Sequence, residues 1–437
     1  MNWHQLLSDK RLGMEDYHDR KHDRTDFQRD YDRLIFSAPF RRMQNKTQVF
    51  PLPGSIFVHN RLTHSLEVSC VGRSLGASVG RALADKYGST AAPFSEIASI
   101  VSAACLAHDM GNPPFGHSGE RAIQAYFSEG NGAKLKEAVE GEGGRWEDFL
   151  NFEGNANTLR LLTHRFIGRR KGGFALTYAT LASIVKYPWA SSMASAKKFG
   201  FFQTEEDTSR KIADELGIIE RNNCYVRHPL VYLVEAADDI CYQIMDIEDA
   251  HKLRLLTDDN AVDLFLGFFE GDRLRHTKET MHIVSDSNEQ IAYLRSGIIG
   301  SLVDECARVF LQYEEDILEG RFDGSIIRRI SNPLQSAYER CSKIAHEKIY
   351  ASKEVVDIEL AGYHIFSHLI DKLTEAINAP THAYSGLLLR RIPEQYDIRA
   401  ESAYGKIQCV LDYISGMTDV YALDLYRKIT GMSLPAV

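Results

Sequence analysis

A histidine and an aspartate, His108 and Asp109, follow an apolar stretch and precede a glycine- and proline-rich loop that ends at a second histidine, His117. An imidazole nitrogen beside a carboxylate oxygen suits a divalent metal that accepts mixed nitrogen and oxygen ligands. Taken alone, the pair is equally compatible with an ordinary hydrogen-bonded helix end. Its meaning therefore depends on which other polar residues the chain places in apolar surroundings.

Two further positions fit the same kind of site. His64 lies near the start of a long helical pattern, and Asp238 lies beside Asp239 in a helix that is otherwise mostly apolar. Burying adjacent carboxylates is costly unless a cation pairs with them. With His108 and Asp109, these residues supply two nitrogens and two oxygens and leave coordination positions open for water and substrate. The sequence therefore predicts one metal site built by three helices.

The elements that must position these residues are predicted to be almost all helical, because apolar residues recur at helical spacing. Ser118 is expected to cap the third helix. The main strand signal is a small hairpin near 48–58. We predict an all-α fold, a helical bundle with a C-terminal helical extension. The expected helices cover 62–87, 95–109, 118–127, 155–167, 176–186, 229–253, 259–269, 287–319, 333–350, 355–379 and 402–430.

Two stretches interrupt this pattern. Residues 128–148 are rich in glycine and glutamate and are expected to form a mobile insertion, and residues 190–227 are polar and irregular. No repeat or low-complexity linker divides the chain. One helical domain with its extension is therefore favoured over independent modules.

Composition sets broad limits on function. The chain has 437 residues, 44% hydrophobic and 25% charged, which is typical of a soluble globular protein. Its net charge of −9 argues against a surface devoted to nucleic acid. Cys70, Cys105 and Cys241 lie in apolar helical patterns and are predicted to be buried free thiols, as expected in a reducing cytoplasm.

Several short motifs extend the metal pattern into a resemblance. The order His, His-Asp, Asp is similar to that of the HD superfamily of phosphohydrolases. The surrounding motifs resemble those of bacterial deoxyguanosine triphosphate triphosphohydrolases, strongly over 24–255 and more loosely over 256–437. The resemblance implies an HD core at 24–255 carrying the two insertions, with 256–437 packed on it. The motifs are Lys46-Thr47-Gln48-Val49-Phe50, Asn60-Arg61-Leu62-Thr63-His64-Ser65, the run from His108 to His117, Phe152-Glu153-Gly154-Asn155 and Glu235-Ala236-Ala237-Asp238-Asp239-Ile240.

In that family the four HD positions bind the metal, which implies His64, His108, Asp109 and Asp238 here. Asp238 is favoured over Asp239 because relatives carry a tyrosine four residues and an aspartate eight residues after the ligand, as Tyr242 and Asp246 do here. Asp239 is expected to hold a ligand histidine instead. The implied cofactor is a divalent ion, Mn²⁺ or Mg²⁺, with Fe, Ni or Zn as alternatives.

His117 and Glu120 match the family's catalytic histidine and its acidic partner, in which the carboxylate orients the ring for acid–base work. An alternative is that Glu120 merely complements a helix dipole. Arg61 matches an arginine that reaches substrate phosphates, a task suited to a guanidinium group.

The resemblance also implies a sugar pocket. Gln48 matches a contact to the 3′-hydroxyl, and Val49 beside it would crowd the 2′ position. Tyr242 and Asp246 match residues that line the deoxyribose, so a ribose hydroxyl would be excluded sterically. Glu153 and Asn155 match a motif near the catalytic histidine, but no role is assigned to them.

The expected function is metal-dependent hydrolysis of dGTP or several dNTPs to a deoxynucleoside and tripolyphosphate in the cytoplasm, with no membrane association. The resemblance also implies a homo-oligomer with a dNTP or single-stranded DNA effector. One alternative is an HD-type phosphodiesterase or nucleotidase. Another is a single-stranded nucleic-acid-binding regulatory protein, which the arginines between 20 and 42 favour; acidic residues alternate through 15–32, so a solvated helix also explains them.

Overall fold

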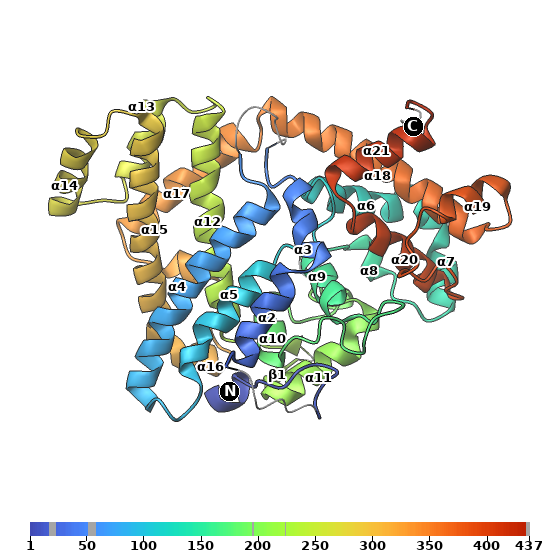
Figure 1. Cartoon of the computed structure of the whole chain (residues 1–437), viewed down its shortest axis with the longest axis horizontal. Coiled ribbons are helices and arrows are strands. Elements are labelled where there is room, and N and C mark those ends of the chain that lie inside the picture. Colours follow the sequence, from blue (N-terminus) through green and yellow to red (C-terminus); the bar gives the residue numbers. More distant parts are fainter. Residues whose placement is uncertain (17–22, 51–57, 195, 223, 434–437) are drawn as a thin grey trace.

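A computed structural model of the chain describes residues 1–16, 23–50, 58–194, 196–222 and 224–433. Across these residues the chain forms 21 α-helices and one antiparallel pair of short strands (Figure 1). The all-α prediction is confirmed. None of the described helices is long and apolar enough to cross a membrane.

The helices before residue 220 are α1 (Trp3–Leu6), α2 (Asp26–Ile35), α3 (Ala38–Arg42), α4 (Arg61–Tyr87), α5 (Ile97–Ala107), α6 (His117–Ser128), α7 (Lys136–Gly141), α8 (Glu147–Leu150), α9 (Gly154–Thr163), α10 (Tyr178–Ile184) and α11 (Glu206–Leu216). The strands β1 (Glu220–Arg221) and β2 (Cys224–Tyr225) follow. The remaining helices are α12 (Val231–Lys252), α13 (Asp258–Leu266), α14 (Gly271–Met281), α15 (Ser287–Gln312), α16 (Glu314–Leu318), α17 (Leu334–Ile344), α18 (Lys353–Asn378), α19 (Ala383–Leu389), α20 (Ala403–Ser415) and α21 (Asp419–Ile429).

The centre of the molecule is the antiparallel pair α4 and α5, with α12 packed against both. Helix α4 begins at a capping box in which Asn60 and Thr63 exchange hydrogen bonds. Glycines on α4 allow α5 to approach closely: a Cβ at Gly76 would lie 2.8 Å from the Cα of Ala98. Because the two helices run in opposite directions, the end of α5 lies beside the start of α4.

Two hydrophobic clusters stabilise the fold by burying apolar surface. The first contains the inner faces of α2, α4, α5, α10, α12, α15 and α17. The second contains α6, the segment 139–152 and the C-terminal helices α18, α20 and α21. In Figure 1, α13, α14 and α15 lie at one side of the molecule and α18–α21 at the other.

Both stretches interpreted as insertions are folded where the structure describes them. Residues 128–148 contain α7 and part of α8, and Val139 and Trp146 are buried in the second cluster, so the prediction of a mobile segment was wrong. Residues 190–227 contain α11, β1 and β2, with Phe199 and Phe202 fully buried. Aromatic side chains from both stretches are part of the hydrophobic core. The sequence does not show this, because frequent glycines and charged residues hide any helical periodicity of the apolar residues.

Other local predictions need correction. Helix α5 ends at Ala107, so His108 and Asp109 lie in the turn that follows it. Ser118 does not cap α6; its hydroxyl donates to the Glu359 carbonyl oxygen at 2.7 Å. Most of the hairpin expected at 48–58 lies outside the described residues, although Thr47 and Asn60 form an isolated antiparallel bridge. Cys105 and Cys241 are buried as predicted, whereas Cys70 is exposed.

The helices α14 and α19 were not expected. Apolar residues in α14 are sparse, and α19 is only seven residues long, so neither shows a clear helical period. The helix expected at 402–430 is divided into α20 and α21 by a turn at 416–418. This break places Asp419 at the start of a helix.

Candidate metal centre and its cavity

The four residues proposed as metal ligands come together. Nε2 of His64, in the first turn of α4, lies 3.0 Å from Oδ1 of Asp238 on α12. Nε2 of His108 lies 3.5 Å from the same oxygen and 3.6 Å from Oδ1 of Asp109. Ligand atoms of His64, His108 and Asp109 all lie within 4.8 Å of one another. These distances suit donors that surround a single ion.

The surroundings of His108 suit a role as a metal ligand. Its Nδ1 lies 2.6 Å from the Cys105 carbonyl oxygen, which leaves Nε2 free to act as a ligand. That Nε2 atom is buried and has no hydrogen-bond partner in the described part of the chain. Buried polar atoms rarely stay unpaired, so a bound cation gives this nitrogen the partner that it lacks. The group of His64, His108 and Asp109 could therefore hold a metal ion.

Charge is concentrated at this centre. Burial alone would raise the pKa of Asp238, but the facing rings of His108 and His64 hold it well below its usual range. Burial would likewise lower the pKa of His108, yet Asp109 and Asp238 raise it to about 9. Without an ion, a protonated His108 therefore offsets part of the carboxylate charge. A divalent cation would take over that role.

Asp109 is fixed from two sides. Nη1 of Arg61 donates to its Oδ2 at 2.6 Å, and Nδ2 of Asn112 donates to its Oδ1 at 2.5 Å. Arg61 is the first residue of α4, so the helix start positions both His64 and this guanidinium. The arginine also lines the adjoining cavity.

His117 and Glu120 face each other one turn apart at the start of α6, with Nδ1 of His117 2.9 Å from Oε2 of Glu120. Oε1 of the buried Glu120 accepts the Gly154 amide at 2.8 Å, which fixes the carboxylate. The His117 side chain is 70% exposed. Its imidazole is therefore oriented by a buried acid while Nε2 remains available to a substrate.

His108, Asp109 and Asp238, together with the His117–Glu120 pair, border one cavity of about 320 Å³. Three cations line it: Arg61, Lys186 and Lys198. Nζ of Lys198 donates to Oε1 of Glu153 at 2.6 Å, and Nζ of Lys186 lies 3.0 Å from Oε1 of Glu235. A cavity with a metal group, an oriented histidine and three cations suits a phosphorylated ligand.

Asp239 also lines this cavity. Burial raises the pKa of its carboxyl to about 7, partly offset by the nearby Lys186. Within the described residues its carboxylate makes no hydrogen bond to His64 or His108, so the expectation that it holds a ligand histidine was wrong. The reason is the helical register, which turns Asp239 away from both rings while Asp238 faces them.

Gln48 and Tyr242 also line the cavity, and Oε1 of Gln48 is buried without a partner among the described residues. The Tyr242 ring stacks on that of Tyr350, with 5.9 Å between ring centroids. The Tyr350 hydroxyl donates to Oδ2 of Asp246 at 2.7 Å. Asp246 itself is buried behind these rings, and Val49 packs against the first hydrophobic cluster; neither is among the residues that line the cavity.

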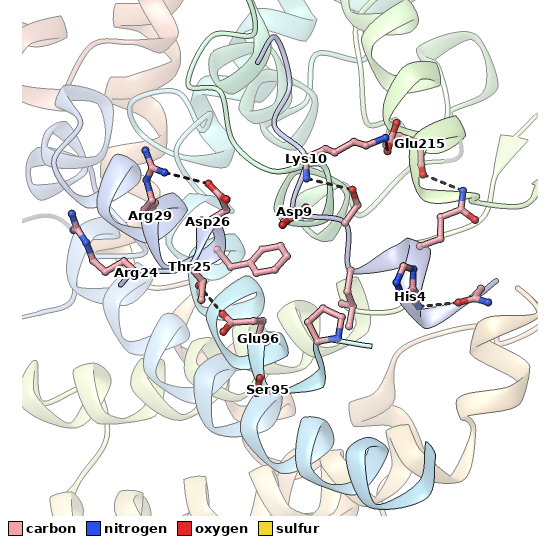
Figure 2. Close-up of a pocket in the computed structure, with 16 residues that line it drawn as sticks. His4, Asp9, Lys10, Arg24, Thr25, Asp26, Arg29, Ser95, Glu96 and Glu215 are labelled. Carbon is pink, nitrogen blue, oxygen red and sulfur yellow. Dashed lines mark hydrogen bonds and ion pairs between the residues drawn. The ribbon is translucent and has the colours of Figure 1, made fainter. Parts of the chain in front are cut away.

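A larger cavity, of about 1060 Å³, lies between the N-terminal segment and α2. Its polar side chains bond to one another (Figure 2): Nζ of Lys10 lies 2.7 Å from Oε1 of Glu215, and Oγ1 of Thr25 donates to Oε2 of Glu96 at 2.9 Å. The group of three possible metal ligands found in the described residues lies elsewhere, at His64. The smaller cavity is therefore the better candidate for chemistry.

Comparison with known proteins agrees with this geometry. Residues 61–162 match the HD domain, and residues 329–428 match the phosphohydrolase-associated domain. A deoxyguanosinetriphosphate triphosphohydrolase-like protein of Synechocystis sp. is 39% identical over 99% of this chain and 100% of its own length. A protein of the same description from Pseudomonas aeruginosa is 38% identical over the full length of both.

The chain belongs to the family of deoxyguanosinetriphosphate triphosphohydrolases and similar proteins. A deoxyguanosinetriphosphate triphosphohydrolase of Yersinia enterocolitica is 31% identical over 92% of this chain and 93% of its own length. The present protein is accordingly an HD-domain phosphohydrolase. The cavity described above lies at the HD motif of this family.

Some residues of the cavity were not predicted. Lys186 and Lys198 lie beside or within the stretch without helical period, so no pattern predicted that they line the cavity. Tyr350, whose ring stacks on that of Tyr242, directly follows a π-helical turn at 345–349, and such turns often occur at functional sites. Asn112 belongs to the quoted HD motif, and its contact with Asp109 becomes visible only in three dimensions.

Proposed function

We propose that this protein hydrolyses deoxynucleoside triphosphates to a deoxynucleoside and tripolyphosphate. The observation that carries the proposal is the placement of His117, oriented by Glu120, on the same cavity as the metal group and three cations. The names of its full-length relatives support the same reaction. Metal binding, proton transfer and triphosphate binding can thus occur within one space.

His64, His108, Asp109 and Asp238 would hold the ion, with Mn²⁺ or Mg²⁺ the expected metal. The bound ion would supply Lewis acidity for attack by water on the α-phosphorus. Arg61 and Asn112 keep the Asp109 carboxylate in place through both of its oxygens. The site thereby holds its donors ready before an ion arrives.

The bond that breaks joins the α-phosphorus to the 5′-oxygen of the nucleoside. Water supplies the new oxygen on phosphorus, and the 5′-oxygen needs a proton as it leaves. His117 donates that proton from Nε2, and Glu120 stabilises the charged ring through Nδ1. Arg61, Lys186 and Lys198 hold the negative oxygens of the triphosphate, which departs intact.

Gln48 and Tyr242 would bind the sugar. Gln48 offers its amide to the 3′-hydroxyl, an assignment supported by its unpaired buried Oε1. Tyr242 would lie against C2′, with Tyr350 and Asp246 fixing its ring from behind. Val49 would act from further away, by filling space beside Gln48. A ribose hydroxyl would then meet the tyrosine ring, which favours deoxynucleotides.

A panel of four dNTPs and four rNTPs with Mn²⁺ tests the proposal when products are separated by ion chromatography. Tripolyphosphate and a deoxynucleoside are the expected products. Pyrophosphate or orthophosphate would instead indicate a phosphodiesterase or nucleotidase with the same HD motif. Size-exclusion chromatography with and without dNTP or single-stranded DNA tests the further expectations of a homo-oligomer and an effector.

A further inference from the structure

Two loops carry side chains into the cavity. The segment 46–48 brings Gln48, and the segment 110–117 brings His117 to the start of α6. The second loop has an uncommon backbone: Phe115 has φ 60° and Gly116 has φ 57°, both in the left-handed region. For a phenylalanine this conformation is costly and persists only where neighbouring structure enforces it.

One carboxylate from the C-terminal region binds both loops. Asp419 is the first residue of α21 and is 8% exposed. Its Oδ1 accepts the Phe115 amide at 3.0 Å, and its Oδ2 accepts the Thr47 amide at 2.8 Å. The two bonds link the residue before Gln48 to the strained residue that precedes Gly116 and His117.

Neighbouring contacts reinforce this link. Nζ of the buried Lys46 donates to the carbonyl oxygens of Asn112 at 2.6 Å and Ser415 at 2.9 Å. The Phe115 ring packs edge-on against Phe366 of α18, with 6.0 Å between ring centroids. A Cβ at Gly362 would lie 2.6 Å from the Cβ of Phe115, so α18 accepts this loop only because position 362 is glycine.

We propose that Asp419 is a positioning residue for catalysis, which sets His117 and the Gln48 segment relative to each other across the cavity. The proposal rests on the proposed function for its catalytic readout. A carboxylate suits the task because it offers two acceptor oxygens to two amides. An asparagine offers one acceptor and one amino group, so one of the two backbone amides would face a donor.

The test uses Asp419→Asn, with Asp424→Asn as a matched control on the same helix. Asp424 is part-exposed, and among the described residues its carboxylate bonds only to Lys428, at 2.7 Å. In Asp419→Asn we expect faster amide hydrogen exchange in peptides containing Thr47 or Phe115. We expect kcat for the preferred dNTP to fall about tenfold or more, with Mn²⁺ affinity unchanged and KM altered less than kcat. The control should behave as wild type in each measurement.

Two further variants separate positioning from general loss of structure. Asp419→Glu keeps the charge and both acceptors and should recover part of kcat, even if Asp419→Asn folds poorly. In a His117→Ala background, Asp419→Asn should add little further loss, because the group that it positions is already absent.

Unchanged exchange in both peptides, or faster exchange with unchanged kcat, would overturn the positioning role. A fall in Mn²⁺ affinity equal to the fall in kcat would also overturn it, because the metal group would then be the part disturbed. If the wild-type protein releases no tripolyphosphate, the proposed function fails separately. The exchange and Mn²⁺ measurements then decide whether Asp419 holds the two loops.

Discussion

Nε2 of His64 lies 3.0 Å from Oδ1 of Asp238, although 174 residues separate them in the chain. The contact joins the first turn of α4 to the middle of α12, two helices that are otherwise packed by apolar side chains. Paired polar groups in such surroundings are retained at a cost in desolvation. A metal ion bound between these two side chains would offset the desolvation cost and explain why they are buried here.

Metal affinity should distinguish the adjacent aspartates on α12. Asp238→Asn removes the charged oxygen that faces both histidines, so Mn²⁺ affinity measured by titration calorimetry should fall about 100-fold or more. Asp239→Asn serves as the matched control and should change it by less than about threefold. Equal losses in the two variants would contradict the assignment of Asp238 as the ligand.

The His117–Glu120 pair should affect turnover and not metal binding. His117→Ala should lower kcat about 100-fold or more, and Glu120→Gln should lower it less, because the ring then keeps its place but loses its charged partner. Mn²⁺ affinity should stay at the wild-type value in both. Tripolyphosphate release by His117→Ala at the parental rate would exclude its role as the proton donor.

The Tyr242 ring should determine discrimination between deoxyribose and ribose. Tyr242→Ala should raise the rate for rGTP relative to dGTP about tenfold, because the wall expected against C2′ is removed. Tyr242→Phe keeps that wall and is the control. Relative values of kcat/KM for both nucleotides give the measurement; an unchanged ratio in Tyr242→Ala would place sugar selection elsewhere.

Arg160 should contribute strongly to stability. Its Nε and Nη1 lie 2.7 Å from Asp412 and 2.8 Å from Glu205, and all three side chains are almost fully buried. Arg160→Ala removes the guanidinium that pairs with both buried carboxylates, which should cost about 3–5 kcal/mol in urea denaturation. Arg308→Ala removes an exposed pair with Glu305 and should cost less than about 1 kcal/mol. Similar losses of unfolding free energy in Arg160→Ala and Arg308→Ala would show that burial does not strengthen the contribution of Arg160.

The buried ring of His59 should make stability depend on pH. Burial alone would lower its pKa, but hydrogen bonds to Asp249 and Glu67 raise it to about 10, above the ordinary value of 6.5. The stabilisation of the folded protein by the protonated His59 ring is therefore complete below about pH 6.5. It is lost as the pH rises through the pKa that His59 has in the folded protein.

The matching measurement compares wild type with His59→Gln by urea denaturation between about pH 6.5 and about pH 9.5. The stability difference should shrink by about 1.4 kcal/mol for each pH unit across this range. A difference that stays constant would mean that His59 is neutral in the folded protein.

The sequence was informative where polar residues interrupted a clear helical period. His64 and Asp238 could be recognised because apolar residues surround them at helical spacing, and Tyr242 reinforced the choice by its spacing from Asp238. The same periodicity predicted α4 and α12 closely. Helix ends were less predictable, since capping depends on contacts such as that of Ser118 with Glu359.

The rest depends on tertiary contacts that leave no local pattern. Lys198 lies within the irregular stretch 190–227, in which Phe199 and Phe202 pack into the second hydrophobic cluster, and no helical period indicates that Lys198 reaches the cavity. Asp419 resembles any acidic residue in the first turn of a helix. Its two bonds to distant amides become visible only once the chain is folded.

The two hydrophobic clusters take their segments from alternating parts of the chain. His64, His108 and Asp238 belong to helices of the first cluster or to their ends, whereas His117 begins α6, whose inner face belongs to the second. During synthesis the proposed metal ligands can come together once α12 has emerged from the ribosome, whereas α6 packs against α8 early but meets α18 only after residues 353–378 have been added. A nascent chain would therefore assemble the proposed metal site before Asp419 can bind the loop that carries His117.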